Sequence, residues 1–220
     1  MVPTTTGKTS QAVWASAWAI VLTAFVVCLA APHLYSPARA ARLNPLLGVD
    51  NWGYQLHGLD PEKVATDNQY DLLVIDYSRD GDEARRFTRA EIQRMKQRPS
   101  GRPRIVLCYL SIGEAENYRY YWRSDWHKGN PAWLLHENKE WKGNFLVKFW
   151  APEWKDIIYA GPDSYLKKIM DAGFDGIYLD RVDVHGEVTG QNANARQDMI
   201  AFVRDIARTA RARSPNFLIV

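Results

Sequence analysis

Cysteine is nearly absent from this sequence. Only Cys28 and Cys108 occur, and Cys28 lies in an apolar stretch near the N-terminus. We expect that stretch to be removed or to stay in a membrane, which leaves Cys108 alone and excludes an internal disulfide. The folded part must therefore be stabilised by its apolar core rather than by cross-links.

Motifs for nucleotide binding, for metal binding and for a catalytic serine triad are missing as well. No G-x-G-x-x-G or Walker sequence is present, so the sequence predicts neither a dinucleotide site nor a phosphate loop. The five histidines show no paired spacing such as H-x-x-x-H. Ser111 follows a predicted strand but lacks a G-x-S-x-G context. We therefore expect no metal and no cofactor.

Charge of one sign does not dominate the chain either. Residues 1–40 hold Lys8 and Arg39 and no acid, and setting these two aside leaves 26 of the 28 basic residues against 25 acidic ones. The arginines that crowd one predicted helix are interpreted as a solvent-facing surface, and we expect no nucleic-acid partner. They are Arg196, Arg204, Arg208, Arg211 and Arg213.

The N-terminal 40 residues differ from the rest. Ala12 to Ala31 is a run of 20 residues without a charge, and Ala38-Arg39-Ala40 has the small residues that a signal peptidase reads. This pattern predicts a cleaved signal peptide and a secreted, periplasmic or extracellular protein. The alternative is a retained membrane anchor, because 20 apolar residues also span a bilayer. Either way, residues 41–220 form the predicted folded domain.

Strands and helices alternate through residues 49–220. Buried or half-buried strands are predicted at 49–56, 71–77, 104–111, 145–150, 177–179 and 217–220. Between them, Asp60-Pro61 and the Thr88-x-x-Glu91 capping box begin helices, and two more helices are predicted before Gly173 and after Asn194. This alternation predicts an α/β protein with a parallel sheet.

The fold predicted from this order is a (β/α)8 TIM barrel that is incomplete at its C-terminus. A barrel needs eight strands and about 250 residues, and about six strands are recognisable here. The sequence ends on Phe217-Leu-Ile-Val220, which reads as a buried strand, so we expect a truncated gene product or a fragment.

Asp180 is the central candidate for chemistry. It directly follows the apolar run Ile177-Tyr178-Leu179, and the carboxyl ends of parallel strands are where ligands bind in such folds. Other acids and flat aromatic rings also follow predicted strands, a combination typical of carbohydrate sites, in which two carboxylates flank the scissile bond. We predict Asp180 and Glu114 as catalytic. The predicted sugar-binding residues are Asp76, Tyr109, Glu116, Trp150, Glu153, Asp183, Trp52 and Tyr54.

Several of these acids have a structural interpretation as well. Asp76 can simply cap the loop after its strand, and Glu153, beside a proline, can begin a helix. Glu116 and Asp183 can be exposed loop acids paired with arginines, and we favour that interpretation for at least one of them. The sequence does not decide between these alternatives.

Five separated motifs resemble the glycoside-hydrolase family of endo-α-1,4-polygalactosaminidases, in particular its bacterial and archaeal branch of extracellular TIM-barrel proteins. The resemblance covers about residues 48–220. The motifs are Asp76-Tyr-Ser78, Cys108-Tyr-Leu-Ser-Ile-Gly-Glu-Ala-Glu116, Asn130-Pro131 with Trp133-Leu134 through Trp141-Lys-Gly-Asn144, Val147-Lys-Phe-Trp150 and Gly173–Asp183.

This resemblance implies an exported hydrolase that cleaves galactosamine-containing polysaccharide, with Asp180 as the strand-end catalytic aspartate. The family's partner glutamate lies on a later strand, and Glu114 is the best candidate within this chain to line the same pocket. A polymer with free amines is cationic, and a mouth ringed by carboxylates would attract it. The alternatives are a sugar-binding pseudoenzyme without the second acid and a membrane-anchored scaffold that keeps Ala12–Ala31.

Overall fold

The computed structural model describes residues 44–220, and the predicted leader, with Ala12–Ala31, lies outside them. The chain divides into an N-terminal unit, Met1–Gly48, and a second unit, Val49–Val220. The described part of the first unit holds one short 3-10 turn, η2 (Pro45–Gly48). Within residues 44–220, no helix combines the length and the apolar character needed to cross a bilayer.

A five-stranded parallel sheet forms the centre of the second unit. Its strands are β1 (Trp52–Gln55), β2 (Leu72–Ile75), β3 (Ile105–Ser111), β7 (Gly176–Asp180) and β8 (Leu218–Ile219), paired in that order. All of β2 and nearly all of β3 are buried, as their uninterrupted apolar sequences predict. The register pairs Ser111 with Asp180, so β3 and β7 end at the same level of the sheet.

The helices begin and end where local sequence signals predict. Asp60 caps α3 (Pro61–Thr66) by accepting a hydrogen bond from the backbone N–H of Glu62. The capping box of Thr88 and Glu91 is fully formed at α4 (Arg89–Lys96). Helix α6 (Tyr165–Ala172) ends at Gly173, whose positive φ of 89° is the left-handed conformation that glycine adopts without strain.

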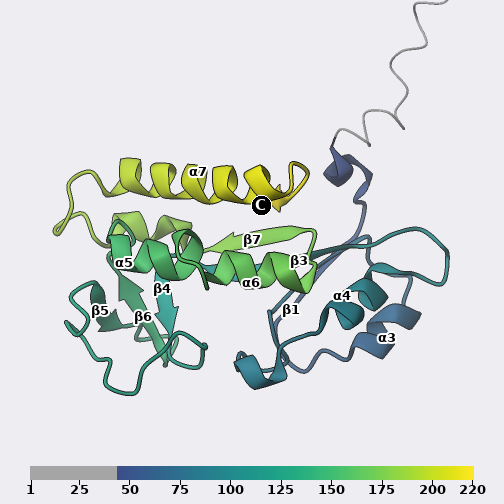
Figure 1. The fold of residues 1–220 in the computed structure, drawn as a ribbon, viewed down its shortest axis with the longest axis horizontal. Helices are drawn as coiled ribbons and strands as arrows, with labels where there is room; N and C mark the ends of the chain where they lie inside the picture. The colour runs from purple at the N-terminus through teal and green to yellow at the C-terminus, as the bar shows by residue number, and fades with distance from the viewer. Residues whose placement is uncertain (1–43) are drawn as a thin grey trace, which may run out of the picture. The chain divides into compact units, whose positions relative to one another are not determined.

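The remaining helical segments all follow β2 in the chain. A short helix, α5 (Pro152–Lys155), continues into a π-helical turn, η4 (Asp156–Ala160). The 3-10 turn η5 (Val182–Gly186) follows β7 after Arg181, and another 3-10 turn, η3 (Glu83–Arg85), precedes α4. The longest helix, α7 (Ala195–Arg213), packs against α6, η4 and η5 (Figure 1).

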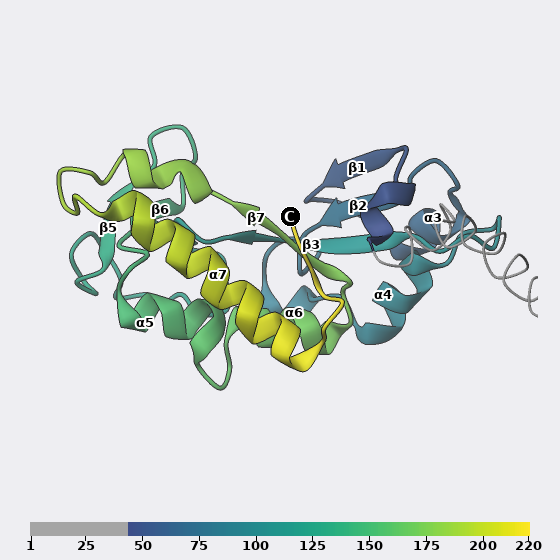
Figure 2. The same cartoon turned by 90° about the horizontal axis from the view of Figure 1, so that it is seen from above.

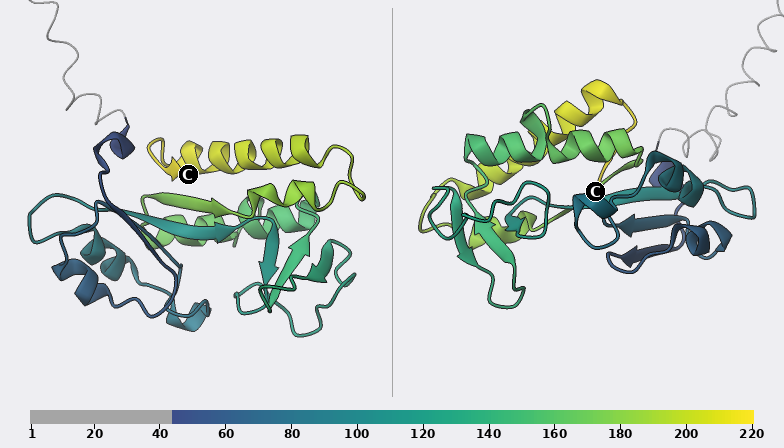
Figure 3. Two further views of the ribbon diagram at one scale, coloured as in Figure 1. Left: turned by 180° about the vertical axis from the view of Figure 1, so that it is seen from behind. Right: turned by 60° about the horizontal axis from the view of Figure 1, so that its bottom comes forward.

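A small antiparallel sheet extends the chain beyond β3. It contains β4 (Glu114–Glu116), β6 (Asn144–Val147) and β5 (Leu134–Glu137), in the order β4-β6-β5. Figures 2 and 3 show this sheet and the α3–α4 pair at opposite ends of the second unit. The predicted strand 145–150 is therefore a strand, but its assignment to the parallel sheet is wrong, because β6 pairs with β4 and β5 instead.

The α/β fold with a TIM-barrel-like parallel sheet is confirmed by this arrangement. One continuous apolar core joins both sheets and the helices around them, from Ile75 and Val106 in the parallel sheet to Trp154 and Phe202 in the helices. This arrangement determines where the candidate functional site lies. The carboxyl ends of β1, β3 and β7 meet β4 and β6 at one place, and the site described next lies there.

Candidate active site

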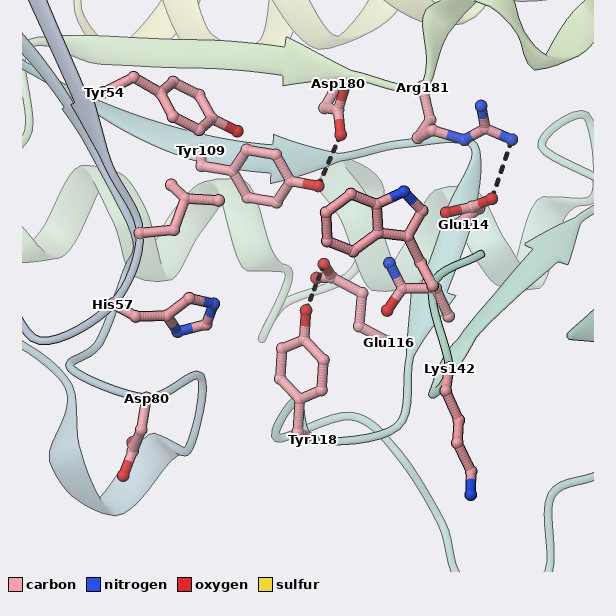
Figure 4. Close-up of a pocket in the computed structure, with 13 residues that line it drawn as sticks. Tyr54, His57, Asp80, Tyr109, Glu114, Glu116, Tyr118, Lys142, Asp180 and Arg181 are labelled. Carbon is pink, nitrogen blue, oxygen red and sulfur yellow. Dashed lines mark hydrogen bonds and ion pairs between the residues drawn. The ribbon is translucent and has the colours of Figure 1, made fainter. Parts of the chain in front are cut away.

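A cavity of about 530 Å³ lies at the carboxyl ends of the parallel strands. The parallel sheet contributes Tyr54 from β1, Tyr109 from β3 and Asp180 from β7, and the antiparallel sheet contributes Glu114 and Glu116 from β4 (Figure 4). The cavity wall is completed by loop and strand residues. These are Leu56, His57, Asp80, Tyr118, Trp141, Lys142, Asn144 and Arg181.

Asp180 is held at the end of β7 by one neighbour on β3 and one in the turn after it. Its backbone carbonyl accepts a hydrogen bond from the N–H of Ile112 at 3.1 Å. Its side-chain oxygen Oδ2 accepts a hydrogen bond from the hydroxyl of Tyr109 at 2.7 Å (Figure 4). Within residues 44–220, no lysine, arginine or histidine forms an ion pair with this carboxylate. Asp180 therefore presents an unneutralised negative charge to the cavity.

The two tyrosines nearest Asp180 keep their protons across the physiological pH range. Burial, the carboxylate of Glu116 and the hydrogen bond to Asp180 all raise the pKa of Tyr109 far above its usual value. Burial and the charge of Asp180 raise the pKa of Tyr54 to about 12. The ring of Tyr54 makes edge-on contacts with the rings of Tyr109 and Tyr178, so the three rings pack against one another.

Glu114 is buried and is paired with the guanidinium of Arg181, which also lines the cavity. Its Oε1 atom receives a hydrogen bond from the side-chain amide of Asn138 at 2.8 Å and lies 2.9 Å from a guanidinium nitrogen of Arg181. Arg181 also contacts Glu187 at 2.7 Å. Burial lowers the pKa of Arg181, but the carboxylates of Glu114 and Glu187 outweigh that effect and raise it. The guanidinium is therefore charged.

Glu116 belongs to a second, deeper charge network. Its two oxygens accept hydrogen bonds from the hydroxyl of Tyr118 at 2.7 Å and from Nε of Arg119 at 2.6 Å. The other two guanidinium nitrogens of Arg119 bind both oxygens of Asp76 at 2.7 Å. Asp76, Glu116 and Arg119 are all at most 4% exposed, so this network connects the cavity to the core.

The two backbone turns next to Glu114 and Asp180 pack closely against each other. Arg181 adopts a left-handed conformation with φ of 60°, which side chains other than glycine seldom take. Gly113, in the turn between β3 and β4, lies against it, and a Cβ atom at Gly113 would clash with the carbonyl oxygen of Arg181 and the side chain of Val184. Close approach of these two turns therefore requires glycine at position 113.

Five residues proposed from the sequence line this one cavity. They are Tyr54, Tyr109, Glu114, Glu116 and Asp180. Asp76 lies behind the cavity wall, where it binds Arg119 and also accepts a hydrogen bond from the backbone N–H of Ser78 at 3.0 Å. Asp76 therefore caps its loop, as the structural interpretation predicts, and it also lies close to the site.

Besides Asp76, four further predicted residues do not line the cavity. Trp52 lies on β1 and is 56% exposed, while Trp150 is half-buried with its ring edge-on to that of Phe149. Glu153 is exposed in the first turn of α5, as its helix-start interpretation predicts. The Asp183 side chain is 78% exposed and lies 3.8 Å from Arg181, as its loop-acid interpretation predicts. These four positions are not retained in the site.

Other cavity residues were not singled out as site residues from the sequence. Tyr118, Trp141, Lys142 and Asn144 come from the aromatic segment and the hairpin that leads into β6, and Arg181 directly follows Asp180. The one sequence signal for these positions is the motif Trp141-Lys-Gly-Asn144. In the structure, its Gly143 has a φ of 90° and makes the tight turn. Among residues 44–220, no three histidine, cysteine or acidic side chains gather to hold a metal ion.

Relatives of this chain occur in bacteria and archaea. An uncharacterized protein of Thermotoga maritima is 40% identical over 176 residues, which are 78% of this chain and 51% of the relative. The uncharacterized protein MJ1477 of Methanocaldococcus jannaschii is 42% identical over 173 residues, 77% of this chain and 47% of the relative. The chain therefore spans about half the length of the curated relatives it matches.

Two solved structures with a similar fold come from a fungus and a bacterium. The Aspergillus fumigatus protein Ega3, in complex with galactosamine, is 27% identical, with a TM-score of 0.51 over 77% of this chain and 57% of that chain. The glycoside hydrolase domain of PelA from Pseudomonas aeruginosa is 13% identical, with a TM-score of 0.55 over 78% of this chain and 59% of that chain. The PelA likeness concerns the fold alone.

The family is established by the extent of the sequence match. Residues 34–220 match the glycoside-hydrolase family GH114, and this range includes both sheets and every residue of the cavity. The acidic and aromatic cavity at the strand ends thus lies in a chain that belongs to glycoside-hydrolase family GH114.

Proposed function

We propose that this protein is an exported glycoside hydrolase that cleaves galactosamine-containing polysaccharide, with Asp180 as one of its two reacting carboxylates. The observation that carries the proposal is the state of Asp180. It lies at the end of a barrel strand, in a cavity of about 530 Å³, with a tyrosine hydroxyl on one oxygen and no cation paired with it among the described residues. Strand-end acids of this kind are the usual catalytic positions in TIM barrels.

The chemistry of glycoside hydrolysis requires two carboxyl groups. One protonates the leaving oxygen, and the other either attacks the anomeric carbon or activates a water molecule. Asp180 suits the role of nucleophile or base, because Tyr109 binds Oδ2 while Oδ1 accepts no hydrogen bond from residues 44–220. Within this chain, Glu114 is our candidate for the other of the two carboxyl groups, because it lines the same cavity.

The substrate class is supported by two independent observations. Ega3, which is 27% identical, was solved in complex with galactosamine. The cavity is lined by four carboxylates, those of Asp80, Glu114, Glu116 and Asp180, against the cations of Lys142 and Arg181. An acidic cavity attracts a polymer whose sugars carry protonated amines.

The proposal is tested by incubating the purified protein with α-1,4-linked polygalactosamine and measuring the release of reducing ends. We expect release by the wild-type protein and none above background by Asp180→Asn. Binding of the polymer is measured in parallel by isothermal titration calorimetry. Binding without release would overturn hydrolysis and support the sugar-binding alternative, and absence of both would overturn the substrate class.

Export is the second part of the proposal, and it depends on residues 1–40. Ala12 to Ala31 followed by Ala38-Arg39-Ala40 is the pattern of a cleaved signal peptide. We expect the mature protein to begin at Ala41, which N-terminal sequencing of protein expressed with its leader would measure. An intact N-terminus on membrane-bound protein would instead support the anchored alternative.

A further inference from the structure

The network behind Glu116 carries more negative charge than positive charge. Arg119 supplies one guanidinium, and Asp76 and Glu116 supply two carboxylates, all bonded within 2.6–2.7 Å. No other cation pairs with Asp76 or Glu116 in residues 44–220. With both carboxylates charged, the three side chains together hold one excess negative charge, although each is at most 4% exposed.

This excess charge reaches the cavity through one side chain. Glu116 lines the cavity, whereas Asp76 and Arg119 do not. Arg119 is also prevented from turning outward, because its guanidinium lies over the rings of Tyr118 and Tyr165, at 4.9 Å and 5.6 Å from their centroids. The cation is therefore fixed on the core side of Glu116, and the anion faces the ligand.

Glu114 has the opposite arrangement, although it lies two residues away on the same strand. Its cation, Arg181, lines the cavity together with it. A positively charged ligand group approaching Glu114 would meet the guanidinium at close range and be repelled. Lys142, the other lysine or arginine of the cavity wall, extends away from Glu116 (Figure 4).

Glu116 also retains capacity to accept hydrogen bonds. Each of its oxygens accepts one side-chain hydrogen bond, from Tyr118 or from Arg119, and each carboxylate oxygen can accept two. Burial and the carboxylate of Glu116 raise the pKa of Tyr118, so its hydroxyl donates throughout the neutral range. A buried anion without full compensation is costly, and a ligand cation would remove that cost.

We propose that Glu116 is the receptor for the ammonium group of an amino sugar and selects free-amine hexosamines over N-acetylated ones. This inference rests on the proposed function, since it assigns a specificity role within the same cavity. Glu116 binds and does not react. Its carboxylate is oriented by Tyr118 on one oxygen and by Arg119 on the other, which fixes where the amine of the bound sugar lies.

The test compares two oligosaccharides on three forms of the whole protein. The ligands are the α-1,4-linked trisaccharides of galactosamine and of N-acetylgalactosamine, titrated by isothermal titration calorimetry. We expect Glu116→Gln to weaken binding of the free-amine trisaccharide about tenfold, the size of a lost charged hydrogen bond. Binding of the N-acetylated trisaccharide should change less than about twofold. The matched variant Asp80→Asn removes the same charge from the wall of the same cavity and should weaken amine binding less than about threefold, because Asp80 is paired with Arg85.

Preserved preference for the free amine in Glu116→Gln would overturn this inference alone. So would an equal loss in Asp80→Asn, because the effect would then come from the general negative charge of the cavity. A wild-type protein that binds neither trisaccharide would overturn the proposed function as well.

A second measurement needs no variant and guards against misfolding of Glu116→Gln. In a crystal structure of the wild-type protein with the galactosamine trisaccharide, we expect one amine nitrogen within about 3.2 Å of a Glu116 oxygen. Amine nitrogens on Glu114 or Asp180 instead, or no amine contact in the cavity, would overturn the assignment.

Discussion

The two ends of the parallel sheet use acidic residues differently. At the amino end, Asp71 accepts backbone hydrogen bonds from Asp50 and Asn51 and pairs with Arg98 at 2.7 Å. Asp175 at the same end accepts a backbone hydrogen bond from Val106 and pairs with Lys96 at 2.7 Å. Each of these carboxylates thus binds a neighbouring segment of backbone and a cation, which joins adjacent strands.

At the carboxyl end, the acids leave bonding capacity unused. Asp180 has one hydroxyl partner and no cation among the described residues, and Glu116 has a cation only on its buried side. The difference indicates that the amino end stabilises the fold and the carboxyl end binds a ligand, as is general in TIM barrels. This contrast between the two ends leads to four predictions, in order of expected effect.

The largest effect is expected from replacing the acids at the two ends of β7, one at a time, with asparagine. Asp180→Asn should lower the rate of polygalactosamine cleavage by about 10³-fold, because the amide cannot act as base or nucleophile. Its melting temperature should stay within about 2 °C of the wild type, since Asp180 forms no ion pair in residues 44–220. Rates are measured from reducing ends, and melting temperatures by differential scanning fluorimetry.

The matched variant is Asp175→Asn, which lies just before the same strand. It should keep the rate within about twofold but lose about 1–2 kcal/mol of unfolding free energy, because its pairing with Lys96 and Val106 is weakened. If Asp175→Asn lost activity and Asp180→Asn lost stability, the division between the two ends would be wrong.

The next effect concerns Arg104 at the amino end. Its fully buried guanidinium donates to the backbone carbonyls of four residues at 2.6–3.0 Å, which join α3, α4 and the segment before β2. Arg104→Met should cost about 3 kcal/mol in the free energy of unfolding, because several buried carbonyls lose their donor. The measurement is urea denaturation followed by tryptophan fluorescence.

Arg102→Met is the matched control for that experiment. Arg102 is exposed, two residues away, and its side chain makes no hydrogen bond within residues 44–220, so we expect a change below about 0.5 kcal/mol. Equal costs for the two variants would contradict the stabilising role of Arg104.

A smaller effect is expected at Tyr109. Tyr109→Phe removes the hydroxyl that orients Asp180 and should lower the cleavage rate about tenfold, with the effect on kcat rather than on KM. The control is Tyr178→Phe, in the residue paired with Tyr109 across the sheet, whose hydroxyl has no partner among the described residues. An unchanged kcat in Tyr109→Phe would show that Asp180 needs no fixed orientation.

The smallest effect is a pH dependence at the amino end. The hydrogen bond from Arg98 and the backbone N–H groups of Asn51 and Asp50 hold the pKa of Asp71 below its usual value. Its stabilising contribution is therefore complete above the unfolded pKa of about 3.9 and is lost as the pH falls through the lower folded pKa. Asp71→Asn should cost about 1 kcal/mol at pH 7, and the difference from the wild type should shrink below about pH 4.

Urea denaturation at about pH 3, 5 and 7 measures this dependence. Asp163→Asn is the control, since Asp163 is exposed and its carboxylate makes no hydrogen bond with residues 44–220. A difference between Asp71→Asn and the wild type that grew on acidification would contradict the expected direction of the pH effect.

The local structure was predictable where one segment of sequence contains its own signal. The apolar runs of β2 and β3, the Thr88–Glu91 capping box and the left-handed Gly173 are all confirmed. The placement of Asp180 at a strand end also followed from sequence, because the apolar run stops one residue before it.

The partners of these segments were not predictable in the same way. The apolar residues of β6 give no information on whether the strand pairs in parallel or antiparallel fashion, so 145–150 was placed in the wrong sheet. Asp76 and Arg119 are 43 residues apart, and only tertiary structure brings them together. Trp141 and Lys142 line the cavity from the segment before β6, where the local pattern around Gly143 indicates a tight turn but not a contact with the cavity.

The contact between Gly113 and Arg181 has a consequence for how the cavity admits a sugar chain. The turn that carries Glu114 and the turn that follows Asp180 touch backbone to backbone, and neither can move without displacing the other. This close packing restrains the spacing of the two carboxylates. Under the proposed function, a polysaccharide would therefore meet two acids whose supporting turns are already packed against each other.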